Sequence, residues 1–521
     1  MADIAAQQRI QKAYDCVVVG AGNGGLSAAA QLAVKGAQVL LLEQHTVPGG
    51  FATSFVRGRF EFEAALHQLA DVGPPTLKGE VRTFLEDELG VYLDWVEIPE
   101  AYRLIVTDPG EDLDVTMPYG VQAYVDAFEK EVPGSREVVT KYLELCREVI
   151  EAVIYLGESR GNPDRKVLTT KYANFLRTAP YTIDQVADAL QIPERVRRIL
   201  HCQWAYLGLP TSRASFTLFA SMMAKFHQAG AWIPRHRSHE LAQALDARIR
   251  EMGGEIQYNT RVQEIQVRDG RVVGVLTDRG DRIATNHVVA NVSPTVTYNR
   301  LIHPSSEVPE IALRACNARL PATSCFVVYM GLDVPLEELG LHEYSYFIYS
   351  NTDSEDIYDS AKVLQAPKGQ AALCLNNAIP DCSPPGTSIV SLTTLLLRPE
   401  PWKSVGPQNY VQVKNRIASD LLAEFENATG TSLREHIEEF EVATPQTFAR
   451  YTGAHNGIIY GYESEPWDAP IPRMMMMEED SYFDGLQLCG GYGIRGLGYH
   501  ASIMTGQLAA LLTLRDMDRG G

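Results

Sequence analysis

The sequence predicts an α/β fold, and three stretches carry this prediction. Residues 14–34 have the pattern of a buried strand, a glycine-rich turn and an alanine-rich helix. Residues 241–293 bring another helix and further strands, and residues 485–514 end the chain with a second strand, glycine turn and helix. Such alternation is typical of a parallel sheet. We therefore expect a Rossmann-type nucleotide-binding domain that the chain leaves and re-enters.

The first glycine turn has the spacing of a dinucleotide site. The strand 14–19 runs into Gly20-Ala21-Gly22-Asn23-Gly24-Gly25. Glycine at these positions permits a tight turn, close approach of a pyrophosphate and close packing of helix on sheet, and the helix N-terminus offers free N–H groups to the anion. The next strand, 37–42, ends in Glu43, where an acid accepts hydrogen bonds from ribose hydroxyls and disfavours a 2′-phosphate. The pattern predicts a dinucleotide other than NADP.

The second glycine turn favours FAD over NAD. It reads Pro48-Gly49-Gly50-Phe51-Ala52-Thr53 and follows soon after the acidic residue. Large FAD-binding oxidoreductases have such a doublet because the extended cofactor runs past this loop.

Two longer stretches resemble a known family. LLEQHTVPGGFATSFVRGRFEFEAALHQL and TPQTFARYTGAHNGIIYGYESEPWD are similar to the FAD-dependent phytoene desaturase, carotenoid cis–trans isomerase and retinol saturase family, within the amine-oxidase-like flavoproteins. The isomerase and saturase branch matches best. The resemblance implies a flavoenzyme that acts on C=C bonds of a long hydrophobic polyene, isoprenoid or retinoid-like lipid, by saturation, desaturation or flavin-mediated isomerisation. It also implies an electron donor or acceptor, NAD(P)H or another.

The resemblance and the glycine spacing together nominate the site. The expected cofactor-binding residues are Gly20, Gly22, Asn23, Gly24, Gly25, Glu43, Gln44, Gly49, Gly50, Thr53, Val262, Gly491, Arg495, Gly496 and Leu497. The last glycine loop and the helix behind it can direct backbone donors and a positive dipole at the pyrimidine edge of a flavin.

The catalytic candidates are His67, Arg495, Tyr499 and His500. Pairing of Arg495 with an acid, and a capping or packing role for His500, are the alternatives. No histidine lies at metal-ligand spacing with carboxylates or cysteines, so we expect no metal.

The chain divides into five expected segments. Residues 1–95, 226–310 and 441–521 form the FAD-binding domain, whereas 96–225 and 311–440 form the helical and sheet parts of an inserted α+β substrate domain, with a mixed sheet over the flavin. Residues 100–225 have a helical pattern throughout, with a capping box at Thr182-Ile-Asp-Gln185. Strands are expected at 323–332 and 387–397, a helix at 409–430, and a hairpin that turns at Asp269-Gly270.

One loop departs from the family. Where the family has a Gly-Gly turn after a proline, Pro234 is followed here by Arg235-His236-Arg237-Ser238-His239. A solvated loop is one interpretation, and contact with an acidic partner or a substrate carboxylate is the other.

Composition limits the partners. A net charge of -19 argues against binding to nucleic acid and against purely electrostatic binding to an anionic bilayer. Any attraction of the protein to lipid would therefore have to be apolar. The eight cysteines form no C-x-x-C pair, the N-terminus has no apolar stretch, and no uninterrupted apolar run reaches the roughly 18 residues of a spanning helix. We expect a cytoplasmic protein with peripheral membrane contact at most.

Two other functions are alternatives to a flavoenzyme that acts on C=C bonds. A flavin amine oxidase needs an aromatic pair that frames the flavin, and the sequence does not identify one. A non-catalytic lipid-binding module of the Rab GDP-dissociation-inhibitor type departs from the flavin-binding glycine pattern, which this chain retains.

Overall fold

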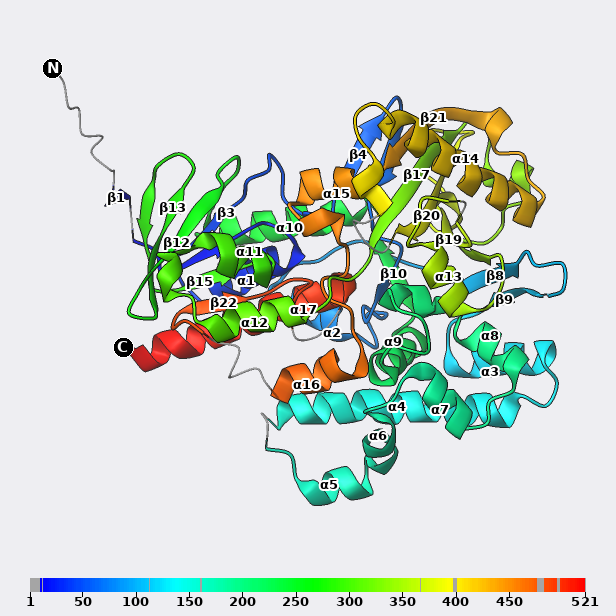
Figure 1. The fold of residues 1–521 in the computed structure, drawn as a ribbon, viewed down its shortest axis with the longest axis horizontal. Coiled ribbons are helices and arrows are strands. Elements are labelled where there is room, and N and C mark those ends of the chain that lie inside the picture. Colours follow the sequence, from blue (N-terminus) through cyan, green and yellow to red (C-terminus); the bar gives the residue numbers. More distant parts are fainter. Residues whose placement is uncertain are drawn as a thin grey trace.

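The computed structural model describes residues 10–11, 13–111, 113–159, 162–365, 367–396, 401–475, 482–493 and 497–520. One end of the molecule holds a parallel sheet and a hairpin sheet, the other holds a larger mixed sheet, and a group of helices lies below that mixed sheet (Figure 1).

The first sheet has the parallel strands predicted for a Rossmann-type fold. Its five strands are all parallel, in the order β11 (Glu255–Gln257), β3 (Val39–Leu42), β2 (Cys16–Val19), β15 (Val288–Ala290) and β22 (Leu486–Leu488). β2 and β3 are buried along their whole length, as continuous apolar runs in a covered parallel sheet should be. Strands from both ends and the middle of the chain therefore build one sheet.

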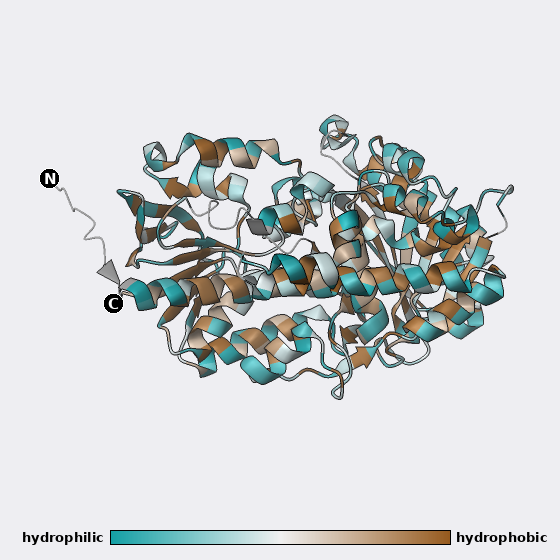
Figure 2. Ribbon diagram, turned by 90° about the horizontal axis from the view of Figure 1, so that it is seen from below, coloured by the Kyte–Doolittle hydropathy of each residue, from teal (hydrophilic) through white to brown (hydrophobic). Residues whose placement is uncertain are grey.

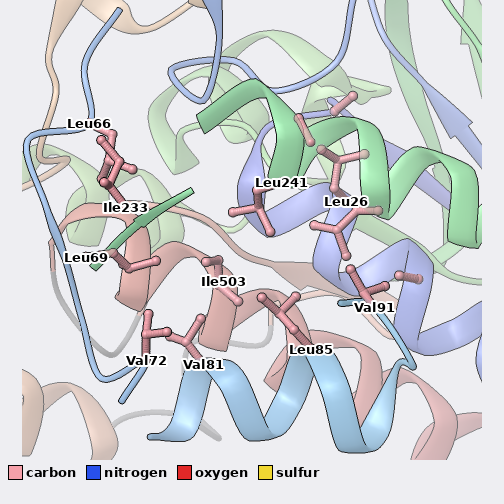
Figure 3. Close-up of a cluster of buried hydrophobic side chains, with 14 of the residues drawn as sticks. Leu26, Leu66, Leu69, Val72, Val81, Leu85, Val91, Ile233, Leu241 and Ile503 are labelled. Carbon is pink, nitrogen blue, oxygen red and sulfur yellow. The ribbon is translucent and has the colours of Figure 1, made fainter. Parts of the chain in front are cut away.

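Three helices cover this sheet: α1 (Asn23–Val34), α10 (Ser238–Glu251) and α17 (Gly498–Gly520). α1 and α17, from opposite ends of the sequence, lie side by side (Figure 1). A β-carbon on Gly506 of α17 would stand 2.2 Å from the carbonyl oxygen of Gly24, so only glycine permits this approach. Leu26, Leu241 and Ile503 extend from the three helices into one shared core (Figure 3).

Further sheets of two to five strands accompany the first sheet. The hairpin sheet has the order β1 (Ile10–Gln11), β14 (Arg282–Ala284), β13 (Arg271–Thr277), β12 (Val262–Arg268) and β16 (Ile302–His303). The predicted hairpin turn is confirmed, since Asp269 and Gly270 join β12 to β13 with φ angles of 51° and 73°. β6 (Leu69–Ala70), β10 (Ala231–Pro234) and β7 (Trp95–Glu97) form a third sheet, and β4 (Ser54–Arg57) pairs with β5 (Phe60–Glu63).

The second domain contains a mixed sheet of seven strands. Their order is β21 (Ile437–Ala443), β17 (Ser324–Leu332), β20 (Ser388–Leu396), β19 (Gly369–Cys374), β18 (Ser345–Tyr349), β8 (Tyr102–Val106) and β9 (Leu113–Met117). The predicted strands appear as β17 and β20, and the predicted helix as α14 (Tyr410–Thr429), which packs on the sheet.

The prediction of a helical pattern from residue 100 onward is wrong for the first part of that segment. β8 and β9 form there, and β8 pairs in parallel with β18, more than 200 residues later. β9 is the neighbouring hairpin partner of β8, whereas the pairing of β8 with β18 joins segments distant in sequence, and local periodicity gave no sign of that pairing.

The helical part then follows as expected. It comprises α3 (Val121–Glu131), α4 (Arg136–Glu158), α5 (Arg165–Thr170), α6 (Ala173–Thr178), α7 (Ile183–Ala189), α8 (Glu194–Leu200) and α9 (Phe216–Ala229). The capping box at the start of α7 is confirmed, because the Thr182 and Gln185 side chains each bond the other's backbone N–H. Hydrophilic and hydrophobic residues alternate along the helices (Figure 2), as amphipathic helices on one core require.

The remaining helices are α2 (Glu80–Arg82), α11 (Pro294–Val296), α12 (Glu310–Ala318), α13 (Ser354–Ser360), α15 (Pro445–Thr452) and α16 (Pro470–Met475). Within the described part of the chain, no helix has the length and apolarity to cross a membrane.

Candidate active site

One cavity of about 2710 Å³ runs from the glycine turns into the second domain. Its polar end is bordered by Gly20, Gly22, Glu43 and Gly50, and its other end by side chains of α4, α9 and the mixed sheet. Pockets for a single drug-sized ligand measure roughly 300–1,000 Å³. The cavity therefore has room for a dinucleotide and a second long molecule.

The two glycine turns of the sequence form one cradle. The Gly49 N–H donates to the carbonyl oxygen of Ala21 at 2.7 Å, and Gly22 and Gly49 form a parallel bridge. A β-carbon on Gly50 would lie 3.3 Å from the Gly22 Cα. Gly22 caps α1 without a side-chain hydrogen bond, so the first N–H groups of this helix stay available for an anion.

Three glycines of the first turn lie close to a specific neighbour, which for Gly24 and Gly25 is backbone. A β-carbon would stand 2.6 Å from the Asn291 Nδ2 at Gly22, 2.6 Å from the Gly490 nitrogen at Gly24, and 1.9 Å from the Gly20 carbonyl oxygen at Gly25. The Asn23 side chain borders the cavity, and its buried Oδ1 has no hydrogen-bond partner among the described residues. An unsatisfied polar atom beside a bare helix N-terminus suits a polar ligand.

Asn291 was missed by the sequence analysis. It follows β15, and its amide lies between the Gly22 and Gly490 turns, at the edge where the parallel strands end. Ligands of open α/β sheets bind at this edge, so a polar residue directly after a predicted strand was the available signal.

Glu43 lies at the end of β3, beside the cradle. Its carboxylate accepts the Ala21 N–H at 2.6 Å with one oxygen and the His45 N–H at 2.7 Å with the other. A carboxylate offers about four lone-pair sites, so both oxygens can still accept ribose hydroxyls. Gln44, Thr53 and Val262 also border the cavity, and Gln44 packs against Gly453.

The C-terminal loop closes the cradle from the other side. Gly490 exchanges hydrogen bonds with the Thr505 hydroxyl of α17, at 3.0 and 3.1 Å, and Gly491 and Leu497 border the cavity. The predicted residues Arg495 and Gly496 lie outside the described residues.

Tyr499 borders the cavity, but its hydroxyl donates to the Phe51 carbonyl oxygen at 2.8 Å. Burial raises the pKa of this phenol well above its ordinary value. Tyr499 therefore joins the C-terminal helix to the second glycine turn as a neutral donor.

His67 is partly buried in a chain of neutral polar groups on the cavity wall. Its Nδ1 lies 3.1 Å from the Tyr206 hydroxyl and its Nε2 lies 2.9 Å from the Ser345 hydroxyl. Gln68 donates to the Tyr206 oxygen at 2.9 Å. Burial lowers the pKa of His67 to about 4, so the imidazole is neutral at neutral pH.

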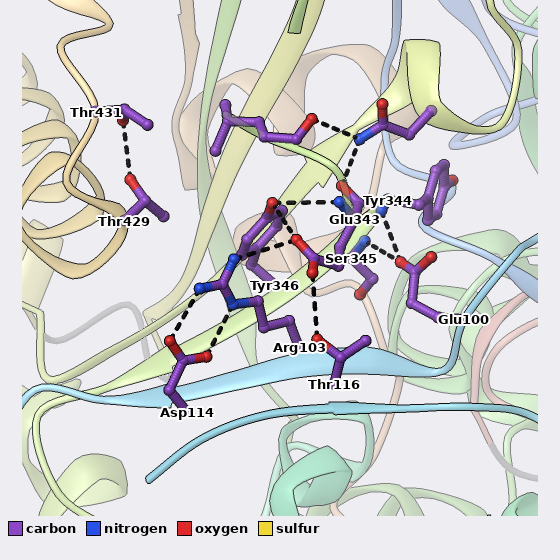
Figure 4. A network of polar contacts seen from close by, with 12 residues as sticks. Glu100, Arg103, Asp114, Thr116, Glu343, Tyr344, Ser345, Tyr346, Thr429 and Thr431 are labelled. Carbon is purple, nitrogen blue, oxygen red and sulfur yellow. Dashed lines mark hydrogen bonds and ion pairs between the residues drawn. The ribbon is translucent and has the colours of Figure 1, made fainter. Parts of the chain in front are cut away.

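A polar network fixes Ser345 from behind (Figure 4). Glu100 accepts the backbone N–H groups of Tyr344 and Ser345 at 2.6 and 2.9 Å. On the same strands, Arg103 joins Asp114 to Glu343 by ion pairs of 2.8 and 3.2 Å. This network thus positions Ser345, the partner of His67.

His500 lies in the first turn of α17, within a charged cluster. Its Nε2 is 2.8 Å from the Lys225 ammonium, 3.2 Å from Asp71 and 3.3 Å from Glu80. Burial alone would raise the Asp71 pKa, but the hydrogen bond from His500 and the charge of Lys225 lower it below its ordinary value. Although the three ligand-type groups cluster closely enough for a metal, Lys225 already supplies the cation.

Two residues of the loop after Pro234, Arg237 and Ser238, are buried and so do not fit the solvated alternative. Arg237 is buried, and its guanidinium donates to the Glu61 carbonyl oxygen at 3.0 Å and to the Cys382 carbonyl oxygen at 2.5 Å. Its φ of 76° and ψ of 173° belong to a region that glycine normally occupies. Arg237 thus keeps the backbone conformation of a glycine turn. Arg235, by contrast, is only partly buried and pairs with Asp94.

Comparisons with known proteins match this geometry. The sequence model of a family described as flavin containing amine oxidoreductase matches residues 24–400. All-trans-retinol 13,14-reductase of Danio rerio is 26% identical over 491 residues, which cover 89% of this chain and 79% of that protein. Chloroplastic prolycopene isomerase of Daucus carota is 24% identical, covering 97% and 80%. Phytoene desaturase (lycopene-forming) of Pseudescherichia vulneris is 25% identical, covering 96% and 99%.

Solved structures share the fold. Cyclohexylamine oxidase from Brevibacterium oxydans superposes with a TM-score of 0.61 at 16% identity, covering 97% of this chain and 100% of that one. Putrescine oxidase bound to putrescine gives 0.62 at 14% identity, covering 97% and 99%. At such identities the likeness shows the fold alone, and it confirms the predicted α/β class.

Proposed function

We propose, from the premise that this chain belongs to the flavin-containing amine oxidoreductase family, that it is an FAD-dependent oxidoreductase acting on C=C bonds of a long polyene, isoprenoid or retinoid-like lipid. The family membership confirms the flavoenzyme class predicted from the sequence. FAD, the substrate and the direction of reaction are the proposed parts.

The cradle supports FAD as the form of the flavin. Gly22 and the uncapped start of α1 would bind the pyrophosphate, and Glu43 would accept the ribose hydroxyls. The second glycine turn, held against the first by Gly49, would lie along the extended cofactor. A bound flavin supplies two-electron redox chemistry at its ring system, and the protein supplies position and electrostatics.

The observation that carries the proposed substrate is the continuity of the cavity. Beyond the cradle its wall is largely apolar and includes Ile150, Val153, Leu218, Met222, Phe347 and Ile357. The relatives are named for retinol, prolycopene and phytoene, which are all long conjugated or isoprenoid molecules. An extended apolar chamber that opens onto a dinucleotide cradle suits a substrate of that shape.

The polar groups on the wall would orient the substrate and exclude bulk water. Two of the sequence candidates are polar groups on this wall: His67, which is neutral and fixed by Ser345 and Tyr206, and His500 with its charged cluster. We expect a hydride donor or acceptor such as NAD(P)H for net saturation or desaturation, whereas isomerisation needs none per turnover.

The experiment uses the purified protein under anaerobic conditions. We expect the absorbance of a bound flavin, identified as FAD after denaturation. Bleaching of the oxidised flavin by a polyene indicates desaturation, reoxidation of the reduced flavin indicates saturation, and a cis–trans product without net redox change indicates isomerisation. A protein that stays colourless with FAD would instead be a lipid-binding module, and bleaching by amines but not polyenes would make it an amine oxidase.

A further inference from the structure

Tyr206 is the centre of a short chain of hydrogen bonds on the cavity wall. It lies between α8 and α9 and borders the cavity together with His67 and Gln68. Its ring packs against Phe226 and Phe347, at centroid distances of 6.4 and 5.5 Å, and these two rings border the cavity as well. The phenol therefore brings a hydroxyl group to an aromatic part of the wall.

The neighbouring hydrogen bonds fix the direction of the Tyr206 proton. The Tyr119 hydroxyl donates to the Gln68 Oε1 at 2.7 Å, so the Gln68 amide turns its NH₂ group to Tyr206 and donates to the phenol oxygen at 2.9 Å. That oxygen also lies 3.1 Å from the His67 Nδ1. The Tyr206 hydrogen therefore points to this nitrogen, and the ring hydrogen of His67 lies on Nε2, which donates to the Ser345 hydroxyl at 2.9 Å.

At neutral pH this Tyr206–His67 pair holds a transferable proton and is a weak base. Burial raises the pKa of Tyr206 well above its ordinary value, so the phenol keeps its hydrogen. Burial lowers the pKa of His67 to about 4, so the imidazole does not take up a second hydrogen. The pair is therefore suited to give a proton to a molecule in the cavity and not to remove one.

Other ionisable groups on the wall are less suited to this task. Both oxygens of the Glu63 carboxylate accept hydrogen bonds, from the N–H and the hydroxyl of Ser238 at 2.7 Å each. The Lys225 ammonium forms an ion pair of 2.7 Å with Asp71. Tyr460 also borders the cavity, but no described residue holds its hydroxyl by a hydrogen bond. The phenol of the pair, in contrast, is both uncharged and fixed in place.

We propose that Tyr206 is the proton donor in the saturation of a C=C bond, with His67 and Gln68 as the residues that position its hydroxyl group. The role rests on the proposed function and adds saturation as the direction of the reaction. One carbon of the double bond receives a hydride from the reduced flavin, which is thereby oxidised, and the neighbouring carbon receives the Tyr206 proton.

This step leaves a phenolate on Tyr206. A carbanion is a far stronger base than a phenolate, so even a phenol of raised pKa can protonate the carbon. The Gln68 N–H already donates to the phenol oxygen and stabilises the charge as it forms. The phenolate takes up a proton from water after the saturated product leaves the cavity, and the pair is then restored.

The first test follows the reoxidation of the reduced flavin by a polyene under anaerobic conditions. A positioned general acid contributes about 10²–10⁴-fold to a rate, so Tyr206→Phe should slow reoxidation by about that factor. The affinity for the polyene, measured by quenching of tryptophan fluorescence in the oxidised enzyme, should stay close to that of the parent, because phenylalanine keeps the ring. In D₂O the parent should place deuterium from the solvent on the carbon beside the one that receives the hydride.

Two other tyrosine variants are the controls. Tyr142 and His201 form a similar pair, at 3.3 Å, which is buried in the helical core and does not border the cavity. Tyr142→Phe and Tyr460→Phe should therefore both reoxidise at the rate of the parent. The proposal is overturned if Tyr206→Phe keeps the parent's rate, if its affinity for the polyene falls as far as its rate, or if Tyr460→Phe is the variant that loses activity.

A second readout needs neither turnover nor substrate. Nitrogen NMR of the protein labelled at histidine should show the Nε2–H tautomer of His67, with the signals assigned by their loss in His67→Asn. Tyr206→Phe should shift the Nδ1 signal, because this nitrogen loses its hydrogen-bond donor. An Nδ1–H tautomer in the parent would overturn the proposal, since His67 would then donate to Tyr206.

Failure of this role can be told apart from failure of the proposed function. A parent whose reduced flavin is reoxidised by no polyene would refute saturation, and the role of Tyr206 with it. An active parent with a fully active Tyr206→Phe variant would refute the role of Tyr206 alone.

Discussion

The replacement Glu43→Gln tests the cradle most directly. Both carboxylate oxygens of Glu43 accept a backbone N–H, from Ala21 at 2.6 Å and from His45 at 2.7 Å. A carboxamide has one oxygen and an NH₂ group, so one of these donors would face another donor. An unsatisfied donor at a partly buried site costs about 1–3 kcal/mol, and the ribose hydroxyls lose an ionic acceptor as well.

We therefore expect FAD to bind about 5–150-fold more weakly to Glu43→Gln. The assay is fluorescence titration of the apoprotein with FAD, with a thermal melt of the apoprotein to measure the cost to the turn alone. Glu251→Gln is the control, because Glu251 is an exposed acid at the end of α10 that pairs with Arg248. Unchanged FAD affinity and unchanged melting of Glu43→Gln would refute the role of the carboxylate in the cradle.

Three further predictions follow from the same structure. Gly25→Ala should abolish flavin retention, because its β-carbon would lie 1.9 Å from a carbonyl oxygen, whereas Gly157→Ala in α4 meets nothing within 4 Å and should stabilise by about 0.5–1 kcal/mol in urea unfolding. Arg237→Gly should unfold at a higher urea concentration than Arg237→Ala. Both variants lose the hydrogen bonds of the guanidinium, but only alanine keeps about 1–3 kcal/mol of backbone strain at a φ of 76°. Equal unfolding midpoints for the two variants would contradict this. His67 has a folded pKa of about 4 against an ordinary 6.5, so its contribution of about 3 kcal/mol is present above pH 6.5 and is lost as pH falls towards 4. Between pH 6.5 and 4 the parent should take up close to one more proton on unfolding than His67→Asn, so the variant should show a smaller slope of unfolding free energy against pH. An unchanged slope would show that His67 is not held neutral in the folded protein.

Most of the nucleotide-binding domain could be predicted from the sequence because its signals are local. β2 and β3 are continuous apolar runs, and the turns after them need glycine for reasons contained within a few residues. Glu43 was recognisable from its place after the second strand. The hairpin turn at Asp269 and Gly270 was recognisable because both residues tolerate the left-handed conformation.

Several omissions have one cause, which is distance along the chain, although the β8–β9 hairpin was missed between neighbouring strands. β8 pairs with β18, whose residues lie more than 200 positions later, so its apolar pattern alone did not identify a strand. The Asn291 side chain lies between the turns at Gly22 and Gly490, which are both far from it in sequence. Arg237 was ambiguous because its hydrogen-bond acceptors, on residues 61 and 382, come from two remote loops.

The sequence by itself determined the class of fold, the paired glycine turns and the flavoenzyme family, since each depends on residue types at short fixed spacings. Only the tertiary structure joined the cradle to an apolar chamber, placed Ser345 and Tyr206 on either side of His67, and put Lys225 among the groups around His500. The physical reason is that turns and strands are selected by local steric and apolar constraints. A cavity, in contrast, exists only where elements from separate parts of the chain leave space between them.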